Sequence, residues 1–295
     1  MARCSSRWAP RSGVQGVLDL ASFASGFPDL DGLRQLAAGG QKWVYTGTHR
    51  TDGSVVLKVI KPGQDAERIR REVLAVQRIA SPRVPRVLEV GTVATPVGSC
   101  IWIREQMVPG RSLRSAIQAQ VLDRPQLHRL AEHMLEALAA GERVRIVHRD
   151  VKPENVILDD RGDFWLLDYG IARHLDLSSA TPTAALAGPG TLGYAPPEQY
   201  RNWKREVDCR ADLFALGVTL YESATGRNPF REGARDQGEV VRRIESLTVP
   251  RLVVAGDAAG AFSEFVGTLM QRRPDHRPSS AADSLDWLRS LTTRS

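Results

Sequence analysis

Features that would assign this protein to a specialised class are scarce in its sequence. Only three cysteines occur in 295 residues (Cys4, Cys100 and Cys209), and none has the spacing of a CxxC motif or a metal site. This usage indicates a reducing compartment and excludes a disulfide framework. No apolar run approaches the roughly 18 residues of a membrane span. The first 13 residues, "MARCSSRWAPRSG", lack the apolar core of a secretion signal, although a transit peptide stays an alternative. We expect a cytoplasmic protein without a membrane span.

Charge of one sign is not concentrated anywhere along the chain. The net charge is +6, but the arginines are scattered, and the pairs Arg70-Arg71, Arg242-Arg243 and Arg272-Arg273 fall within helical patterns. Such pairs are typical of solvated helix faces, so no nucleic-acid partner is expected. A composition of 42% hydrophobic and 25% charged residues is ordinary for a globular protein with a large core or two lobes.

The apolar pattern divides the chain into three parts. Residues 1–30 have no clear periodicity and are interpreted as an extension. In residues 31–108, the strand-like runs "WVYTGTHR" and "SVVLKVI" flank a "TDG" hairpin turn, a helix is predicted over 65–79, and two further strands follow. Helical periodicity dominates residues 109–295, where "ADLFALGVTLYESATG" is apolar on nearly all sides. The prediction is an α+β fold with a small β-rich lobe and a larger helical lobe.

Two charged residues stand where apolar ones are expected. Lys58 lies inside the strand-like run "VVLKVI", and Glu72 falls on the apolar face of the helix that follows it. A buried ammonium group is costly unless it is paired, so these two residues are candidate partners. The alternative is a lysine on an edge strand that faces solvent.

A second group of polar residues surrounds a predicted hairpin. The stretch "IVHRDVKPENVIL" (146–158) places Asp150 and Asn155 between apolar ends, and Asp168 closes the strand "FWLL" on the other side of the turn "DDRGD". The hairpin would fold Asp168 back beside the other two. Carboxylate and amide oxygens beside a cleft suit Mg²⁺ with a polyphosphate, because Mg²⁺ takes few protein ligands and shares phosphate oxygens. The alternative for Asp168 is an ordinary Asp-initiated turn.

The motifs "VVLKVI", "HRDVKPEN", "LLDYG" and "GYAPPEQ" occur in an order and spacing that resemble the Hanks-type (eukaryotic-like) serine/threonine protein kinases, with a faint similarity to bacterial members. The later "DLFALG" and "RRPDHRP" add to the resemblance, which covers the chain from about residue 31 to its end. It implies the bilobal protein-kinase fold. It also implies phosphoryl transfer from ATP to Ser or Thr hydroxyls of protein substrates, which the sequence does not identify, with autophosphorylation through self-association.

The resemblance implies a role for each polar residue of the 146–158 stretch. Asp150 would orient the substrate hydroxyl and accept its proton, and Lys152 would stabilise the transferring phosphoryl group. Asn155 would hold a metal ion, and Thr191 would contact Asp150. A lysine two residues after the aspartate is typical of kinases that act on Ser and Thr.

The nucleotide site is implied in the same way. Lys58 would contact the α- and β-phosphates of ATP and be positioned by Glu72, while Asp168 would join Asn155 in binding Mg²⁺, with Mn²⁺ as an alternative. The adenine ring would lie between a roof and a floor. These are formed by Val44 and Val56 above and by Ile157 below.

Supporting roles are implied for residues around this centre. Asp212 would hold the backbone of the 146–158 loop, and Glu198 would pair with Arg277. His148 and Arg149 precede Asp150 and take structural or regulatory roles, since an arginine at this position often receives a phosphorylated segment. Candidate phosphorylation sites lie in the Ser/Thr-rich segment 171–191; they are Ser178, Ser179, Thr181 and Thr183. An ordinary linker is the alternative for each of them.

The sequence departs from the family pattern at several positions. In "AAGGQKWV" only Gly39 falls on one of the three family glycines, and Ala37 and Lys42 occupy the other two positions. Lys42 would add a phosphate contact, and a lysine that points to solvent is the alternative. Tyr169 replaces the usual phenylalanine and adds a hydroxyl that needs a partner. Phe214 stands where tryptophan is common, and alignment on Gly110 makes Glu105 an unusual residue at the back of the adenine pocket.

Two other functions remain as alternatives to an active kinase. A pseudokinase would use the fold as a nucleotide-binding or scaffolding module, and the irregular glycine loop favours it mildly. A small-molecule phosphotransferase is disfavoured by the long segment that ends in "APPE", which resembles a platform for protein substrates. The retained set of residues argues for the active enzyme; it comprises Lys58, Glu72, Asp150, Asn155 and Asp168.

Overall fold

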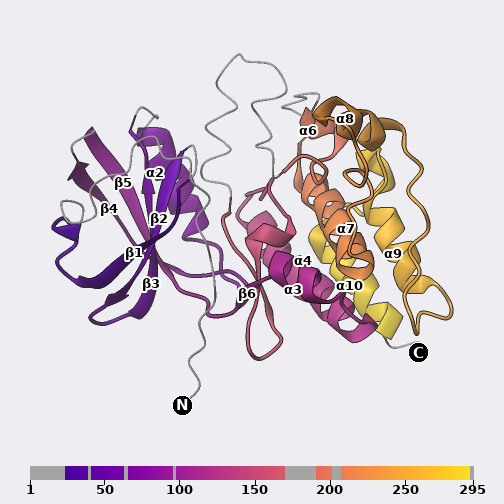
Figure 1. Cartoon of the computed structure of the whole chain (residues 1–295), viewed down its shortest axis with the longest axis horizontal. Coiled ribbons are helices and arrows are strands. Elements are labelled where there is room, and N and C mark those ends of the chain that lie inside the picture. The colour runs from indigo at the N-terminus through magenta and orange to yellow at the C-terminus, as the bar shows by residue number, and fades with distance from the viewer. Residues whose placement is uncertain are drawn as a thin grey trace.

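The computed structural model forms two lobes that lie side by side (Figure 1). The small lobe is a five-stranded sheet with one helix, and the large lobe is mainly helical, with a short three-stranded sheet on the side that faces the small lobe. The predicted α+β bilobal fold is therefore confirmed. The structure describes residues 24–38, 41–62, 66–95, 98–169, 191–200 and 207–292.

The small-lobe sheet is antiparallel with the strand order β1-β2-β3-β5-β4. The predicted hairpin is present: β2 and β3 pair from Lys42 opposite Ile60 to His49 opposite Gly53, where a glycine with φ 69° supplies the left-handed turn conformation. The strands are β1 (Leu30–Ala38), β2 (Lys42–His49), β3 (Gly53–Ile60), β4 (Val87–Thr95) and β5 (Gly98–Gln106).

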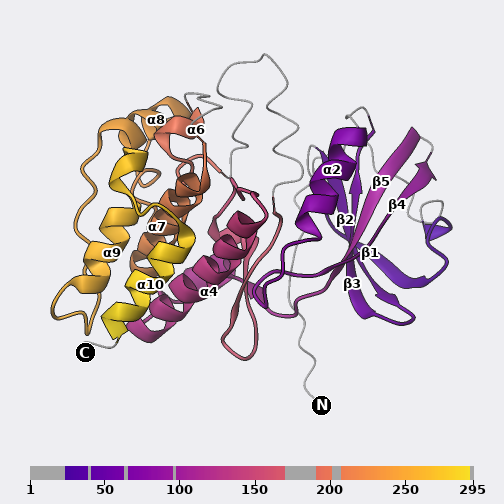
Figure 2. The same ribbon diagram turned by 180° about the vertical axis from the view of Figure 1, so that it is seen from behind.

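The two faces of this sheet bury different residues, as strand alternation requires. One face packs Tyr45 and Leu57 against Phe27 and Leu30, so these two residues of the predicted 1–30 extension contribute to the core. The other face carries Lys58 and is covered by helix α2 (Ala66–Val76). Figure 2 shows α2 lying across this sheet. Its apolar contact with the sheet is formed by Ile60, Ile69, Val73, Ile101 and Ile103.

The chain leaves β5 and enters the large lobe at Gly110. This glycine has φ 144°, and a Cβ atom here would collide with the main-chain oxygen of Leu158. Its absence of a side chain lets the connection pass close to the hairpin that carries the predicted active residues. Three short strands then form the second sheet in the order β6-β7-β8; they are β6 (Arg111–Ser112), β7 (Val156–Leu158) and β8 (Phe164–Leu166).

Helix α7 (Cys209–Thr225) is the centre of the large lobe, as its apolar sequence predicts. Asp208 caps its start by accepting a hydrogen bond from the Arg210 N–H, and Gly226 ends it in the left-handed conformation with φ 74°. The other helical segments are α3 (Leu113–Ala119), α4 (Arg124–Arg143), η1 (Pro153–Asn155), α6 (Pro197–Tyr200), α8 (Gln237–Ser246), α9 (Ala261–Leu269), η2 (Pro274–His276) and α10 (Ala281–Thr292).

Helix α4 ends close to the position that its sequence predicts. The periodic pattern of this segment indicates an end near Gly141, and the helix ends at Arg143. A Cβ atom at Gly141 would lie 2.7 Å from the ring of Tyr169. The glycine therefore makes room for a packed ring instead of ending the helix. Among the described helices, none combines the length and the apolar composition that crossing a membrane requires.

Candidate active site

The 146–158 loop follows α4 and ends with strand β7. It lies on the side of the large lobe that faces the small lobe. Val151 and Val156 are fully buried in the large-lobe core, and they anchor the loop at its middle and its end. Beside these anchors, Asp150 and Lys152 are partly buried and Asn155 is buried, and both Lys152 and Asn155 are bonded to Asp150. The charged stretch is thus a fixed structural unit with an apolar foundation.

Asp150 is at the centre of this unit. Its Oδ2 accepts from the Lys152 ammonium at 2.9 Å and from the Asn155 Nδ2 at 2.9 Å, and its Oδ1 accepts from the Thr191 hydroxyl at 2.9 Å. The same Thr191 oxygen accepts from Lys152 at 3.0 Å. The structure therefore brings together all four residues for which the sequence predicts catalytic roles. The carboxylate of Asp150 is held in one orientation by donors from three directions.

The backbone of the loop is held from behind by Asp212 of α7. The N–H groups of His148 and Arg149 each donate to its carboxylate at 2.6 Å. Asp212 is only 3% exposed, and this burial raises its pKa to about 7, because the two N–H donors, which act in the opposite direction, only partly offset it. The contact expected between Asp212 and the loop backbone is present.

His148 connects the loop to the strand end that precedes Asp168. Its Nε2 bonds the main-chain oxygen of Leu167 at 2.8 Å, and its Nδ1 accepts from the Asp150 N–H at 3.2 Å. His148 is fully buried, so it acts as a spacer that sets the distance between the loop and the hairpin.

Two residues of this region adopt a left-handed backbone without being glycine. Arg149 has φ 64° and Asp168 has φ 59°. Such conformations cost about 1–3 kcal/mol each and persist where the surroundings impose them. Here the Arg149 N–H is fixed by Asp212, and the carbonyl before Asp168 is fixed by His148.

Four alternating charges meet where the small lobe faces this loop. Asp168 Oδ1 lies 2.7 Å from the Lys58 ammonium and 2.9 Å from the Lys42 ammonium, and Lys58 also pairs with Glu105. Burial acts to lower the pKa of Lys58, but the carboxylates of Asp168 and Glu105 outweigh it and raise that pKa. Burial acts to raise the pKa of Asp168, and the two lysines outweigh it and lower that pKa. Lys58 and Asp168 are therefore charged at neutral pH.

The predicted pair between Lys58 and Glu72 is not among the ion pairs that Lys58 forms in the described structure, and the role of Glu72 in positioning Lys58 stays a prediction. In the described structure the carboxylates that meet Lys58 belong to Glu105 and Asp168, and Glu72 is not one of them. The helical pattern correctly places Glu72 on α2 beside the sheet, where it is half-buried. Which carboxylate reaches Lys58 depends on the register of the strands and on the position of α2 on the sheet. The periodicity of apolar residues in the sequence predicts neither of these.

The residues predicted to enclose adenine are only partly buried, unlike their apolar neighbours. Val44 and Val56 lie on the same face of the sheet as Lys58, because Val44 pairs with Lys58 and Val56 is two residues away from it. Ile157 lies on β7 in the large lobe. Their adenine-binding roles stay predictions, and Gly39 lies outside the described residues.

A divalent metal would need additional oxygens here. Within the part of the chain that the structure describes, no three His, Cys, Asp or Glu side chains form a metal-binding group. Asp168 and Asn155 do approach through the hairpin, because the Leu167 N–H donates to the Asn155 carbonyl at 2.8 Å. One carboxylate and one amide fit a metal that takes its remaining ligands from nucleotide phosphates and water.

Glu198 and Arg277 meet deep in the large lobe, as the resemblance implies. Their side chains are 2% and 0% exposed, and the Arg277 guanidinium donates to both carboxylate oxygens, at 2.6 and 3.2 Å. Arg277 also lies over the ring of Phe214, with 5.0 Å from its Cζ to the ring centroid. Its other N–H groups donate to main-chain carbonyls of Arg210, Gln271 and Arg272.

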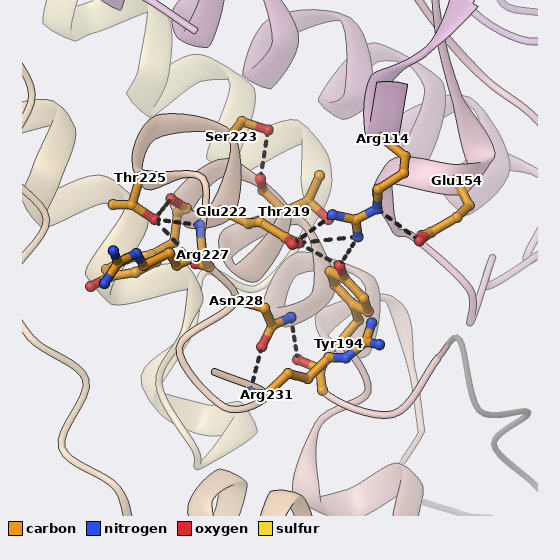
Figure 3. A network of polar contacts seen from close by, with 12 residues as sticks. Arg114, Glu154, Tyr194, Thr219, Glu222, Ser223, Thr225, Arg227, Asn228 and Arg231 are labelled. Atoms are coloured by element: carbon orange, nitrogen blue, oxygen red, sulfur yellow. Dashed lines mark hydrogen bonds and ion pairs between the residues drawn. The ribbon is translucent and has the colours of Figure 1, made fainter. Parts of the chain in front are cut away.

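A further polar network escapes the sequence analysis. Figure 3 shows Arg114 of α3 between Glu154 of the 146–158 loop, Glu222 of α7 and Tyr194. The guanidinium lies 2.9 Å from Glu154 and 2.7 Å from Glu222, and the Tyr194 hydroxyl also bonds Glu222. Burial and the Glu222 carboxylate raise the pKa of Tyr194. Arg114 lies in a seven-residue helix, too short for periodicity to mark it, so no sequence signal singles it out.

Comparisons with known proteins agree with this geometry. Residues 31–287 match the model of the protein kinase domain. The chain is 36% identical over 255 residues to "Probable serine/threonine-protein kinase PkwA" of Thermomonospora curvata and 32% identical over 255 residues to "Serine/threonine-protein kinase PknL" of Mycobacterium tuberculosis. It is 29% identical over 266 residues to "Probable serine/threonine-protein kinase PknB" of Corynebacterium glutamicum.

These matches cover most of this chain but only part of each relative. They include 84%, 84% and 86% of this sequence, and 32%, 61% and 40% of the respective relatives. The chain therefore spans between about a third and three fifths of the length of the curated relatives it matches. The similarity therefore includes residues of both lobes of this chain but only one part of each relative.

Proposed function

We propose, from the premise that this chain belongs to the protein kinase domain family, that it transfers the γ-phosphoryl group of ATP to Ser or Thr hydroxyls of protein substrates. The observation that carries the proposal is the Asp150 carboxylate held by Lys152, Asn155 and Thr191. The relatives named above are serine/threonine kinases by name, which supports the same class of acceptor. The family uses ATP and a divalent metal in general.

Asp150 is the residue we assign to the acceptor hydroxyl. The hydroxyl oxygen forms its bond to the γ-phosphorus, its proton passes to Asp150, and the bond to the leaving ADP oxygen breaks. Lys152 lies beside this carboxylate and would neutralise charge on the transferring group. Because Thr191 and Asn155 already fix the carboxylate, little reorganisation is needed when the substrate arrives.

Lys58 and Lys42 are the residues we assign to the phosphates. Both now bind Asp168, and nucleotide phosphates would offer them alternative anionic partners. Asp168 and Asn155 would hold the metal, which we propose to be Mg²⁺, with Mn²⁺ as the alternative. When bound, the metal supplies positive charge to the phosphate oxygens. Val44, Val56 and Ile157 would contact the adenine ring.

Several further expectations belong to this proposal. The division into residues 1–30, 31–108 and 109–295 remains a proposal, and so does a cytoplasmic location, which agrees with free thiols at Cys100 and Cys209. The candidate phosphorylation sites Ser178, Ser179, Thr181 and Thr183 lie outside the described residues. Autophosphorylation between two associated copies would appear as a mass shift within residues 171–190, and an active preparation without any shift there would contradict it.

Transfer of labelled γ-phosphate to a generic basic protein tests the activity directly. We expect wild-type protein with ATP and Mg²⁺ to label the substrate, and Asp150→Asn to reduce the rate by about 10²–10⁴-fold because the proton acceptor is lost. Lys58→Met should also reduce it strongly. Asp160→Asn, an exposed change in the turn of the same hairpin, is the matched control and should retain full activity.

The unfolding midpoint of Asp150→Asn should stay within a few degrees of wild type, so that lost activity is not lost folding. Wild-type protein that binds nucleotide but transfers no phosphate would overturn the proposed activity. Equal rates for Asp150→Asn and wild type would overturn the role of Asp150.

A further inference from the structure

Lys58 and Glu105 are brought together by the register of two neighbouring strands. In the β3–β5 pair Lys58 lies opposite Ile103, and Glu105 lies opposite Val56. Lys58 and Glu105 are therefore diagonal neighbours on one face, a spacing that long side chains bridge. The two side chains are each about 10% exposed, and they form an ion pair. Both ends of this pair belong to the hydrogen-bonded interior of one sheet.

Glu72, in contrast, is carried by a separate element. Helix α2 is attached to the sheet through apolar contacts of Ile69 and Val73 with isoleucines of β3 and β5. The residues of this contact are apolar, so the contact itself does not include Glu72. A carboxylate on α2 reaches Lys58 only if the helix sits at the right height, whereas Glu105 is held by the same hydrogen bonds that hold Lys58.

We propose that Glu105 is the positioning residue for Lys58, so that the phosphate-binding lysine is oriented by the sheet and does not require a carboxylate from α2. The inference rests on the proposed function, because it assigns a task to Lys58 that only a nucleotide-binding site needs. Lys58 has two carboxylate partners, and Asp168 is the one shared with Lys42 and placed to bind a metal. Glu105 remains with Lys58 when Asp168 and the phosphates exchange partners.

The charges of the cluster agree with this division. Lys42 and Lys58 balance Asp168 and Glu105, so the four groups are neutral in sum. Glu105 is 7% exposed, and a carboxylate at such a depth is costly unless a cation stays beside it. Lys58 is the cation that the structure supplies, which ties its ammonium to one location whether or not nucleotide is present.

The test compares Glu105→Gln with Glu72→Gln, the same chemical change at the two rival positions. The dissociation constant for ATP with Mg²⁺ is measured by calorimetry, and kcat and KM for ATP are measured separately. Loss of a charged hydrogen bond predicts a weakening of about tenfold or more for Glu105→Gln and a smaller one for Glu72→Gln. Glu89→Gln, on the adjacent strand β4 and 51% exposed, is the control and should match wild type.

A double-variant cycle shows whether Glu105 acts through Lys58. In a Lys58→Met background, Glu105→Gln should change nucleotide affinity by less than about twofold, because its partner is already absent. The loss should fall mainly on KM for ATP, while a general structural defect would lower kcat and the unfolding midpoint together. If Glu105→Gln folds poorly, Glu105→Met in both backgrounds replaces it, because an apolar side chain of similar length leaves no charge unpaired at that position.

An equal or larger loss for Glu72→Gln would overturn the proposal, as would the same loss from Glu105→Gln with and without Lys58. Tighter nucleotide binding by Glu105→Gln would also overturn it, since the carboxylate would then only repel phosphate. Failure of the proposed function looks different: nucleotide would bind, with the predicted dependence on Glu105, but no phosphate would reach protein. Wild-type protein that binds no nucleotide would overturn both.

Discussion

The four-charge cluster of Lys42, Lys58, Glu105 and Asp168 and the interior of the large lobe both contain paired charges, but the partners of these charges differ in kind. Between the lobes, Asp168 is shared by Lys42 and Lys58, and the side chains of Asp168 and Lys42 are 30% and 27% exposed. In the interior, Arg277 uses its whole guanidinium on Glu198 and on main-chain carbonyls, with no exposure at all. The first arrangement leaves partners that a ligand can replace. The second leaves none.

This difference separates residues that can exchange partners when a ligand binds from residues that stabilise the fold. Charges bonded mainly to other side chains can change partner when a nucleotide arrives, at modest cost. Charges bonded to the main chain are part of the fold, and moving them would open the core. Substitutions in the interior should therefore change stability first, while those in the four-charge cluster should change activity first.

Arg277→Met should give the largest loss of stability. It removes five donated N–H groups and leaves the Glu198 carboxylate buried without its cation, which typically costs about 3–5 kcal/mol. For a protein of this size the unfolding midpoint should fall by roughly 5–20 °C. Differential scanning calorimetry measures this directly.

The matched control is Arg273→Met, four residues away in the same segment. Its ion pair with Asp275 is on the surface, with side chains 69% and 54% exposed, so its removal should leave the midpoint unchanged. The distinction between the two regions would fail if both arginine variants lost the same stability, or if Arg277→Met lost activity without losing any.

Asp212→Asn should alter the pH dependence of stability. The folded pKa of Asp212 is about 7, above its usual 3.8, so the folded state retains a proton that the unfolded state has released. The stability due to this group is then greatest at low pH and is lost as pH rises through 7. The gap in unfolding free energy between wild type and Asp212→Asn should narrow by about 2–3 kcal/mol from pH 5 to pH 8.

Chemical denaturation at several pH values measures this gap, with Tyr169→Phe as a variant that leaves Asp212 in place and should run parallel to wild type. A gap that stays constant or widens with rising pH would show that Asp212 is already ionised at pH 5. In that case Asp212 in the interior would be ionised as fully as Asp168 in the four-charge cluster.

Tyr169→Phe should have the smallest effect. The Tyr169 hydroxyl donates to the buried Ala137 carbonyl at 2.6 Å, while its ring packs edge-on against His148. Phenylalanine keeps the ring contact and loses one hydrogen bond, worth about 0.5–1.5 kcal/mol. Activity measured well below the unfolding midpoint should match wild type, and a tenfold loss would mean that the hydroxyl belongs to the reacting centre.

The hairpin geometry explains why part of the site is predictable. Asn155 and Asp168 are joined by one short β-hairpin, so their approach follows from local pattern and chain length alone. Tyr169 likewise needs a hydroxyl partner once it is buried, and it has one in Ala137. The distant contact between Glu198 and Arg277 has no such local cause. It could be anticipated only through the family resemblance.

The partner of Lys58 cannot be predicted from the sequence pattern for a different reason. Periodicity places Lys58 on a strand and Glu72 on the apolar face of a helix. It does not predict the register between β3 and β5, which brings Glu105 beside Lys58. Glu105 stands out in the sequence only through the alignment on Gly110, which makes it an unusual residue at the back of the adenine pocket. Arg114 cannot be predicted in this way, because the seven residues of α3 are too few to show the periodicity of apolar residues that indicates a helix.

The left-handed backbone at Arg149 and Asp168 gives the site an internal conflict of requirements. Glycine would adopt these torsions freely, yet glycine has no carboxylate to offer a metal and no guanidinium to offer a phosphate. At Asp168 the left-handed main chain favours glycine, whereas the proposed metal site requires a carboxylate, and the residue present is the one that supplies the carboxylate. A screen for thermal tolerance alone would therefore favour relief of the backbone strain at Asp168 over the carboxylate on which the proposed reaction depends.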